Sequence, residues 1–256
     1  MIHPTAIVNP GAEIGEDVEI GAYSVIGPKV RIGRGTQIMP HAVIDGATTI
    51  GADCRIFPFA CIGTQTQDLK FTGGETFVQI GDRTTIREYV TVNCGTNEGE
   101  TTRVGSDCLL MISSHVAHAS IIGNGVILGN ATGLAGEVTI EDFAIVSGLT
   151  GVHQFTKIGR YAFIGGCSKI SQDCPPFMIA EGNPAVVRGI NSVGIKRHGM
   201  SEESQRQLKQ AYKIIYREGF SVRNAIEKIR SDPDMSSEEI SCLISFVESS
   251  KRGIIR

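Results

Sequence analysis

The chain has 256 residues, enough for one large hydrophobic core or for a core with a small second domain. Its net charge of -3 and isoelectric point near 6.1 argue against a nucleic-acid-binding surface, because phosphate contacts need a strong basic excess. The start of the chain resembles neither a signal peptide nor a membrane anchor, and no later stretch could span a bilayer. We therefore expect a cytoplasmic protein without stable membrane insertion.

Most of the chain, up to Cys174, carries a repeat of six. An aliphatic residue returns at every sixth position through residues 8–62, 80–92 and 104–170, and only three positions break the series, namely Asp68, Gly74 and Glu98. A period of six fits neither a helix nor an open sheet. It fits a short strand followed by a tight corner that glycine eases, so three such sides make one coil. The sequence predicts a prism of stacked parallel strands.

Two polar, glycine-rich segments interrupt the aliphatic pattern. We expect residues 64–79 and 93–103 to leave the prism as loops that keep the count of six intact. Insertions into repeats often carry a binding surface.

Residues 111–120, MISSHVAHAS, place two histidines three positions apart. Because three sides of six close one coil, positions i and i+18 lie one above the other, and His118 shares a column with Gly136, Gln154 and Gln172. His115 shares another with Gly133, Gly151 and Lys169. A histidine one coil from a glycine backbone N–H suits a general base opposite an oxyanion donor.

Other interpretations stay open from the residues alone. The histidines could be outward strand residues, or zinc ligands completed by His153 or by another subunit. Cys108 and Cys167 lack an evident His-acid arrangement for nucleophilic catalysis. Seven cysteines without a CxxC pair are typical of reduced thiols in a cytosol, and we interpret them as small apolar fillers; they are residues 54, 61, 94, 108, 167, 174 and 242.

The prism should end within residues 173–184, where Pro175, Pro176 and Pro184 interrupt strand pairing. We therefore divide the chain into a solenoid of residues 1–174 and a connecting segment with a helical domain in residues 175–256.

Three helices are predicted in the second part. The stretch 201–219 places four residues on one helical face, namely Leu208, Tyr212, Ile215 and Tyr216. A short helix follows in 221–232. The stretch 236–250 opens with a capping box of Ser236 and Glu239.

Several motifs resemble one enzyme family over essentially the whole chain. The segments QDLK, GSDCLLMISSHVAHAS, HQF, GGCSKISQDCPP and NSVGIKRHG are similar to those of the cytosolic UDP-N-acetylglucosamine O-acyltransferases of lipid A biosynthesis. The resemblance implies a left-handed parallel β-helix with a small C-terminal helical domain, assembled as a homotrimer with sites between subunits. It implies transfer of a 3-hydroxyacyl group from acyl carrier protein to the sugar 3-position of a UDP-sugar, with no bound cofactor or metal beyond the carrier's phosphopantetheine thioester.

The resemblance also assigns roles to individual positions. His118 matches the general base, and Gly136 matches the oxyanion donor. Lys169 stands where the family limits acyl length. The remaining positions match substrate contacts: Gln67, Asp68 and Lys70 in the first loop, His115 and His153 along the cleft, and Gln154, Asn191 and Arg197 around the nucleotide. His198 is a further candidate substrate-binding residue.

The chain also departs from the family pattern. Ala119 stands where the family often has Asp after the base, so the orientation of His118 must come from backbone or another side chain. Four further differences cluster at the cleft: Asn93 and Glu137 replace His, Val193 replaces Glu, and His198 replaces Arg. The acceptor therefore stays open between a 3-hydroxyl and a 3-amino group.

Competing classes are an acetyl-CoA-dependent O-acetyltransferase, the related glucosamine N-acyltransferase, a solenoid carbonic anhydrase and a non-enzymatic scaffold. The N-acyltransferase normally carries an extra N-terminal uridine-binding domain, whereas coils begin at once here. A carbonic anhydrase would need three histidines. A scaffold would leave the His118 column unexplained.

Overall fold

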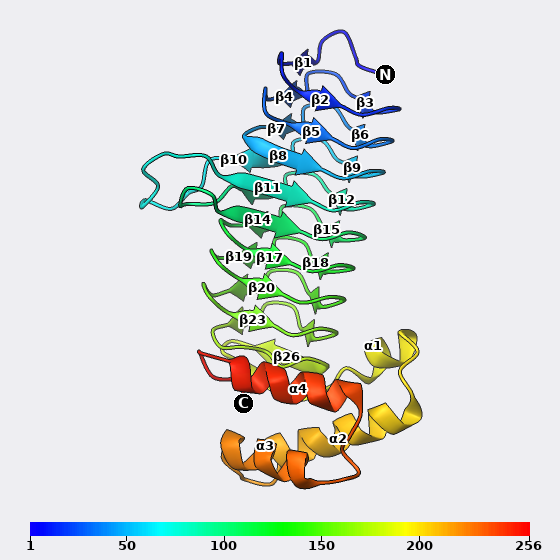
Figure 1. Cartoon of the computed structure of the whole chain (residues 1–256), viewed down its shortest axis with the longest axis vertical. Helices are drawn as coiled ribbons and strands as arrows, with labels where there is room; N and C mark the ends of the chain where they lie inside the picture. Colours follow the sequence, from blue (N-terminus) through cyan, green and yellow to red (C-terminus); the bar gives the residue numbers. More distant parts are fainter.

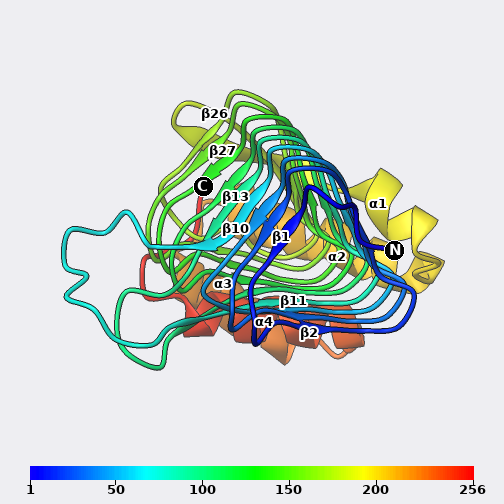
Figure 2. The same ribbon diagram turned by 90° about the horizontal axis from the view of Figure 1, so that it is seen from above.

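The computed structural model describes all residues 1–256. Short parallel strands wind into a three-sided prism with the N-terminus at one end and the helices at the other (Figure 1). Seen along its axis, the prism is triangular, and two loops project from one corner (Figure 2). The predicted prism of stacked strands is confirmed.

Each side of the prism is one sheet. Sheet A holds, from the N-terminal end, β3 (Glu19–Ile20), β6 (Gln37–Ile38), β9 (Arg55–Ile56), β12 (Thr85–Ile86), β15 (Leu109–Leu110), β18 (Ile127–Leu128), β21 (Ile145–Val146), β24 (Phe163–Ile164), β26 (Met178–Gly182) and β27 (Ala185–Ile190). Sheet B holds β1 (Ile7–Val8), β4 (Val25–Ile26), β7 (Val43–Ile44), β10 (Cys61–Thr64), β13 (Thr91–Asn93), β16 (His115–Val116), β19 (Gly133–Leu134), β22 (Gly151–Val152) and β25 (Lys169–Ile170). Sheet C holds β2 (Glu13–Ile14), β5 (Arg31–Ile32), β8 (Ala47–Ile50), β11 (Phe77–Ile80), β14 (Thr101–Val104), β17 (Ile121–Ile122), β20 (Thr139–Ile140) and β23 (Lys157–Ile158).

The constant length of the coil fixes the register of every sheet. His115 pairs with Gly133, and Gly133 pairs with Gly151. In the two coils that carry the loops, Cys61 pairs with Thr91 and Thr91 pairs with His115. Each of these coils is therefore longer than 18 residues by a whole multiple of six. Both loops leave the corner between sheets B and C. They are shorter than predicted and span 65–76 and 94–100, because 77–79 and 101–103 pair as strands.

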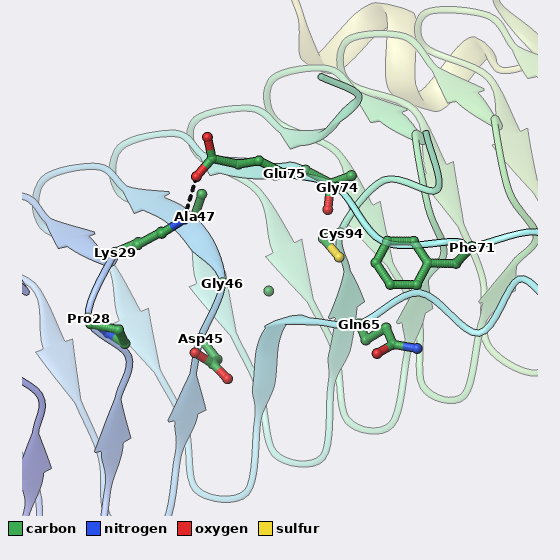
Figure 3. Close-up of a pocket in the computed structure, with 12 residues that line it drawn as sticks. Pro28, Lys29, Asp45, Gly46, Ala47, Gln65, Phe71, Gly74, Glu75 and Cys94 are labelled. Carbon is green, nitrogen blue, oxygen red and sulfur yellow. Dashed lines mark hydrogen bonds and ion pairs between the residues drawn. The ribbon is translucent and has the colours of Figure 1, made fainter. Parts of the chain in front are cut away.

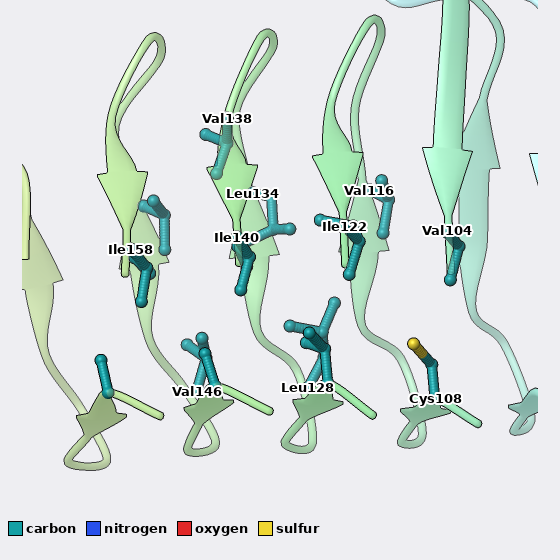
Figure 4. Close-up of a cluster of buried hydrophobic side chains, with 14 of the residues drawn as sticks. Val104, Cys108, Val116, Ile122, Leu128, Leu134, Val138, Ile140, Val146 and Ile158 are labelled. Carbon is teal, nitrogen blue, oxygen red and sulfur yellow. The ribbon is translucent and has the colours of Figure 1, made fainter. Parts of the chain in front are cut away.

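The repeated aliphatic residues fill the prism. Figure 4 shows them in layers, with Val116, Leu134 and their neighbours pointing inward from successive coils. The side chains of Leu110, Leu128 and Val146 are fully buried. Because each layer contacts the layers above and below, burial of apolar surface is continuous along the prism.

Small residues fill the space beside each corner, two positions before the aliphatic one. Many carry hydroxyl groups that donate to backbone carbonyls of the next coil, as Thr36 does to Gly51 (2.8 Å) and Thr84 to Gly105 (2.7 Å). These bonds offset the cost of burying a polar group. Cys54 and Cys108 occupy the same kind of position, whereas Cys174 pairs with the inward Ile158 and takes the inward place of the next coil.

Burial raises the pKa of these buried thiols, to about 11 at Cys108 and about 12 at Cys174. The filler interpretation therefore holds for them, and Cys94 is also buried. It is wrong for Cys167, which is exposed, while Cys61 and Cys242 are half-buried.

The glycines that follow many aliphatic residues have a different purpose from the one predicted. The left-handed corner conformation falls on later, mostly non-glycine residues such as Asp17 (φ 55°) and Phe59 (φ 64°). A β-carbon on Gly33 would instead lie 2.6 Å from the carbonyl carbon of Gly51 in the next coil. Glycine is required there because successive coils approach closely, rather than because the corner needs a positive φ.

The parallel pairing continues past residue 174. The prolines at 175 and 176 precede β26, which pairs with β24 in parallel, and β27 then pairs with β26 in antiparallel orientation. The expected interruption of strand pairing therefore does not occur at Pro175 and Pro176, because prolines before the first strand residue remove no ladder hydrogen bond.

Four helices complete the chain: α1 (Ser192–Arg197), α2 (Glu202–Tyr216), α3 (Val222–Ser231) and α4 (Glu238–Ser249). The sequence predicted the last three and missed α1, which is too short for a periodic signal. In α2, Leu208 and Ile215 are buried, with Tyr212 and Tyr216 half-buried beside them. The predicted cap of α4 is wrong by one residue, because Ser237 rather than Ser236 accepts a hydrogen bond from the Ile240 N–H (3.3 Å).

The cap assignment can be tested by a matched pair of substitutions. Ser237→Ala should lower the free energy of unfolding by about 1 kcal/mol, because the Ile240 N–H loses its acceptor. Ser236→Ala should change it by less than about 0.5 kcal/mol, as expected for a substitution away from a cap. Chemical denaturation of both variants measures the difference. Equal losses would contradict the assignment.

Candidate active site

The predicted column of His118 and Gly136 lies at the B/C corner, one coil below the second loop. The imidazole of His118 is half-buried, with 11% of the side chain exposed. A β-carbon built on Gly136 would collide with Nε2, Cε1 and Cδ2 of that ring. Only glycine at 136 therefore leaves room for the imidazole in its present position.

The backbone N–H of Gly136 donates to no group of the protein. It belongs to the second residue after the inward Leu134, a position that Pro10 and Pro28 occupy at the same corner in earlier coils. Proline fits because the coil makes no use of an N–H there. Glycine at this position supplies a free donor beside the imidazole.

The acidic residue nearest to His118 comes from the first loop. Asp68 Oδ2 lies 3.6 Å from His118 Nε2, and 13% of the Asp68 side chain is exposed. Nδ1 of His118 is buried without a hydrogen-bond partner, and the neighbouring Ala119 offers none. No hydrogen bond at Nδ1 orients the ring, so the expected support from backbone or another side chain lies at the Nε2 side, where the Asp68 carboxylate and Gly136 approach it. Asp68 and the close contact with Gly136 fix the imidazole of His118 at its Nε2 edge.

The Asp68 carboxylate is tightly held. Oδ1 accepts a hydrogen bond from the Lys70 N–H (3.0 Å), and Oδ2 lies 3.4 Å from Lys70 Nζ. The Lys70 N–H is the main cause of a lowered pKa for this carboxyl group, and the charges of Lys70 and His118 lower it further. Asp68 is therefore ionised at neutral pH. Gln67 lies beside it and is exposed.

His115 has a different environment from His118. Its Nδ1 lies 2.7 Å from Thr91 Oγ1. Burial lowers the pKa of His115 below 6.5, and the nearby His118 adds to the effect. His115 is therefore a neutral imidazole fixed in the wall of the site.

Below His115, the outward positions of sheet B are glycines in two successive coils. A β-carbon at Gly133 or Gly151 would meet no atom within 4 Å. The next residue of this column, Lys169, is exposed and ends the glycine strip. In the neighbouring column Gln154 is half-buried, while His153 is exposed and its Nδ1 lies 3.0 Å from the Gln154 carbonyl oxygen.

The predicted nucleotide contacts of α1 lie elsewhere on the same chain. Asn191 caps α1, accepting from the Gly194 N–H (2.9 Å) and donating to the Tyr161 carbonyl (2.9 Å). His198 packs on Phe143 and Tyr161 at the corner between sheets C and A. Figure 2 shows α1 and the two loops at different corners of the triangle. One chain therefore does not bring Asn191, Arg197 and His198 to His118.

A pocket of about 330 Å³ lies on the N-terminal side of the first loop (Figure 3). Phe71 and Cys94 line it on the loop side, and the ion pair of Lys29 with Glu75 (2.7 Å) closes one edge. His118 does not line this pocket, so the first loop separates it from the candidate site.

No three metal-binding side chains lie close enough together within the chain to hold a metal ion. None of the helices has the length and apolar character needed to cross a membrane.

Comparisons with known proteins agree on one family. A family model described as UDP-N-acetylglucosamine O-acyltransferase, domain 2, matches residues 173–255. The acyl-[acyl-carrier-protein]–UDP-N-acetylglucosamine O-acyltransferase of Herminiimonas arsenicoxydans is 47% identical over 260 residues, which cover 100% of this chain and 99% of that protein. The corresponding enzyme of Thiobacillus denitrificans is 48% identical over 256 residues, with the same coverage.

Solved structures agree with the sequence relatives. The UDP-N-acetylglucosamine acyltransferase of Bacteroides fragilis superposes with a TM-score of 0.97 at 44% identity, covering 100% of both chains. That of Francisella novicida gives 0.96 at 36% identity, covering 100% of this chain and 94% of that one. The predicted left-handed parallel β-helix with a small helical C-terminal region is confirmed. By sequence and by fold, the chain belongs to the family of acyl-[acyl-carrier-protein]–UDP-N-acetylglucosamine O-acyltransferases, which begin lipid A biosynthesis.

Proposed function

We propose that this protein transfers a 3-hydroxyacyl group from the phosphopantetheine thioester of acyl carrier protein to the 3-position of a UDP-sugar, in the cytoplasm. The acceptor is UDP-N-acetylglucosamine or its 3-amino analogue. The observation that carries the proposal is that the His118 imidazole lies close to residue 136, whose backbone N–H is free. Only glycine at this position permits so close an approach of the ring. Seven free cysteines fit the cytoplasmic setting.

His118 is the general base of the proposed mechanism. Nε2 takes the proton of the acceptor as the oxygen or nitrogen attacks the thioester carbonyl. The Gly136 N–H then donates to the oxyanion of the tetrahedral intermediate. When the intermediate collapses, the carrier thiolate leaves and receives the proton back from His118. Asp68, 3.6 Å from Nε2, stabilises the transient imidazolium in place of an acid at position 119.

The active form is a trimer with the site between subunits. His118 and the α1 residues lie at different corners of one chain, so they can meet only if two copies supply them. If sheet A of one copy faces sheet B of the next around a threefold axis, each B/C corner meets a neighbouring C/A corner. Gln154 and His118 then face Arg197 and His198 of another copy.

The surfaces of sheets A and B suit this arrangement. The outward residues of sheet A in the C-terminal half are apolar, namely Leu109, Ile127, Ile145 and Phe163. They would face the glycine strip of Gly133 and Gly151 and form an apolar channel for the acyl chain. Stacked rings at the A/B corner, 5.1 to 5.2 Å apart, would line the axis; they are Tyr23, His41, Phe59 and Tyr89.

A few positions bear on whether the acceptor group is a 3-hydroxyl or a 3-amino group. Asn93 is buried and donates to Thr64 Oγ1 (3.1 Å) and the Gln65 carbonyl (3.1 Å), so it supports the first loop from inside. Glu137, Val193 and His198 are exposed and free to contact the sugar or nucleotide. Their departure from the family pattern is the reason for including a 3-amino acceptor.

The decisive experiment is an acyl-transfer assay. Purified protein is given 3-hydroxyacyl carrier-protein thioesters of several lengths with each of the two acceptors, and products are identified by mass spectrometry. His118→Ala should reduce turnover by a factor of about 10² or more, because it removes the general base, while light scattering still reports a trimer. His3→Ala, at the exposed N-terminus, is the control. Absence of product from the wild type with both acceptors, or near-normal turnover of His118→Ala, would overturn the proposal.

The neutral state of His115 has a measurable effect on stability. Unfolding returns its pKa from the lowered value to about 6.5, so the unfolded chain binds more protons between these two values. The free energy of unfolding should therefore fall as pH drops from 6.5 through the folded pKa. His115→Gln should show a smaller fall than the wild type and than the control His3→Gln in denaturation curves at pH 7, 6 and 5. Identical pH dependence in all three proteins would contradict this assignment.

Lys169 is the proposed limit on acyl length. It lies three coils from His115, about 14 Å at the usual strand spacing. Lys169→Gly should extend the glycine strip and shift donor preference toward longer acyl chains. Lys157→Gly, an outward position on sheet C, should leave the preference unchanged. A donor profile of Lys169→Gly that matches the wild type would remove this role.

A further inference from the structure

Two buried threonines connect the loops beside the candidate site. Thr66 belongs to the first loop and Thr96 to the second, and each is about 5% exposed or less. Their Oγ1 atoms are 3.3 Å apart. Neither residue was singled out by its sequence pattern, and neither makes a hydrogen bond with His118.

The two hydroxyl groups and Asp68 form a closed set of hydrogen bonds. The Asp68 N–H donates to Thr66 Oγ1 (3.1 Å), and Thr96 Oγ1 donates to Asp68 Oδ2 (3.3 Å). An ionised carboxylate can only accept, so the single hydroxyl hydrogen of Thr96 is committed to Oδ2. Thr66 must therefore supply the hydrogen between the two hydroxyl groups. All three bonds have one consistent direction.

The second loop holds Thr96 rigidly. The N–H groups of Thr96 and Asn97 both donate to Glu100 Oε2, at 2.9 and 3.0 Å, and the Asn97 side chain donates to Glu100 Oε1. The loop is also tied to the first one by a bond from the Gly99 N–H to the Glu75 carbonyl (2.8 Å). The loop thus presents one fixed hydroxyl group to Asp68.

Asp68 needs such support because another cation competes for it. The same Oδ2 atom lies 3.6 Å from His118 Nε2 and 3.4 Å from the exposed Lys70 Nζ. Exposed ion pairs are weak and mobile, whereas a buried hydroxyl donor fixes one carboxylate position. Without the Thr96 hydroxyl, Lys70 would draw the carboxylate toward solvent and away from His118.

We propose that Thr66 and Thr96 are a positioning pair that holds the Asp68 carboxylate against His118, so that the second loop serves the base without touching substrate. This inference rests on the proposed function of His118. The titratable and charged groups around the imidazole are Asp68, Lys70, His115 and Glu100.

The test compares Thr96→Val, which removes the hydroxyl group at nearly constant shape, with Thr96→Ser, which keeps it. Thr96→Val should lower kcat about tenfold, as expected for a displaced catalytic arrangement, and change KM for either substrate by less than about twofold. The acid limb of the kcat/KM profile should move to lower pH, because an imidazolium that loses a nearby carboxylate is less stable. Thr96→Ser should restore both properties.

Asn97→Ala is the matched control, since it weakens the same loop without contacting Asp68. It should leave the acid limb in place. A Thr96→Val enzyme with normal kcat and an unmoved limb would overturn the inference. An equal loss of kcat in Thr96→Val and Asn97→Ala, again with unmoved limbs, would overturn it in favour of a purely structural role.

A second measurement separates this inference from the proposed function. The pKa of His118 is followed by NMR in ¹³C-histidine-labelled full-length protein, with the resonance assigned by His118→Gln. A lower pKa in Thr96→Val than in the wild type supports the positioning pair even if the wild type transfers no acyl group. An unchanged pKa overturns it.

Discussion

The columns of the candidate site depend on the backbone hydrogen bonds between successive coils. Those bonds force positions i and i+18 into the same place one coil along, at His115, Gly133, Gly151 and Lys169. The constant length of the coil alone therefore aligns side chains that are distant in sequence. The aliphatic layers make the alignment stable, and small residues with bonded hydroxyl groups allow the corners to close. The two loops at one corner add Asp68 to this framework, beside His118.

The repeat explains why so much was predictable. The period of six predicts the strands, the three sheets and the columns of His118 and His115, because every residue in the prism has a fixed place relative to its neighbours. The helices α2, α3 and α4 carried an ordinary periodic signal. The bounds of the loops were too wide, since polar outward residues such as Gln79 and Arg103 hide the last strand residues before each inward aliphatic position.

The contacts of the site were less predictable, for physical reasons. Asp68 lies on an irregular loop, so its approach to His118 depends on hydrogen bonds to Thr66, Thr96 and Lys70 that no spacing rule encodes. The unpaired Nδ1 of His118 could not be inferred from the absence of an acid at 119. The placement of Asn191 as the cap of α1 also depends on tertiary contacts with Tyr161.

The free N–H at Gly136 has a consequence for how such a site can change over time. The coil makes no use of this N–H at several levels of the corner, and proline removes it at Pro10 and Pro28 while glycine retains it at 136. The scaffold thus has equivalent backbone positions in several coils, and a single substitution between proline and glycine decides whether such a position has a free N–H. A solenoid of this kind could move its reaction centre along its own axis by whole coils without altering its architecture.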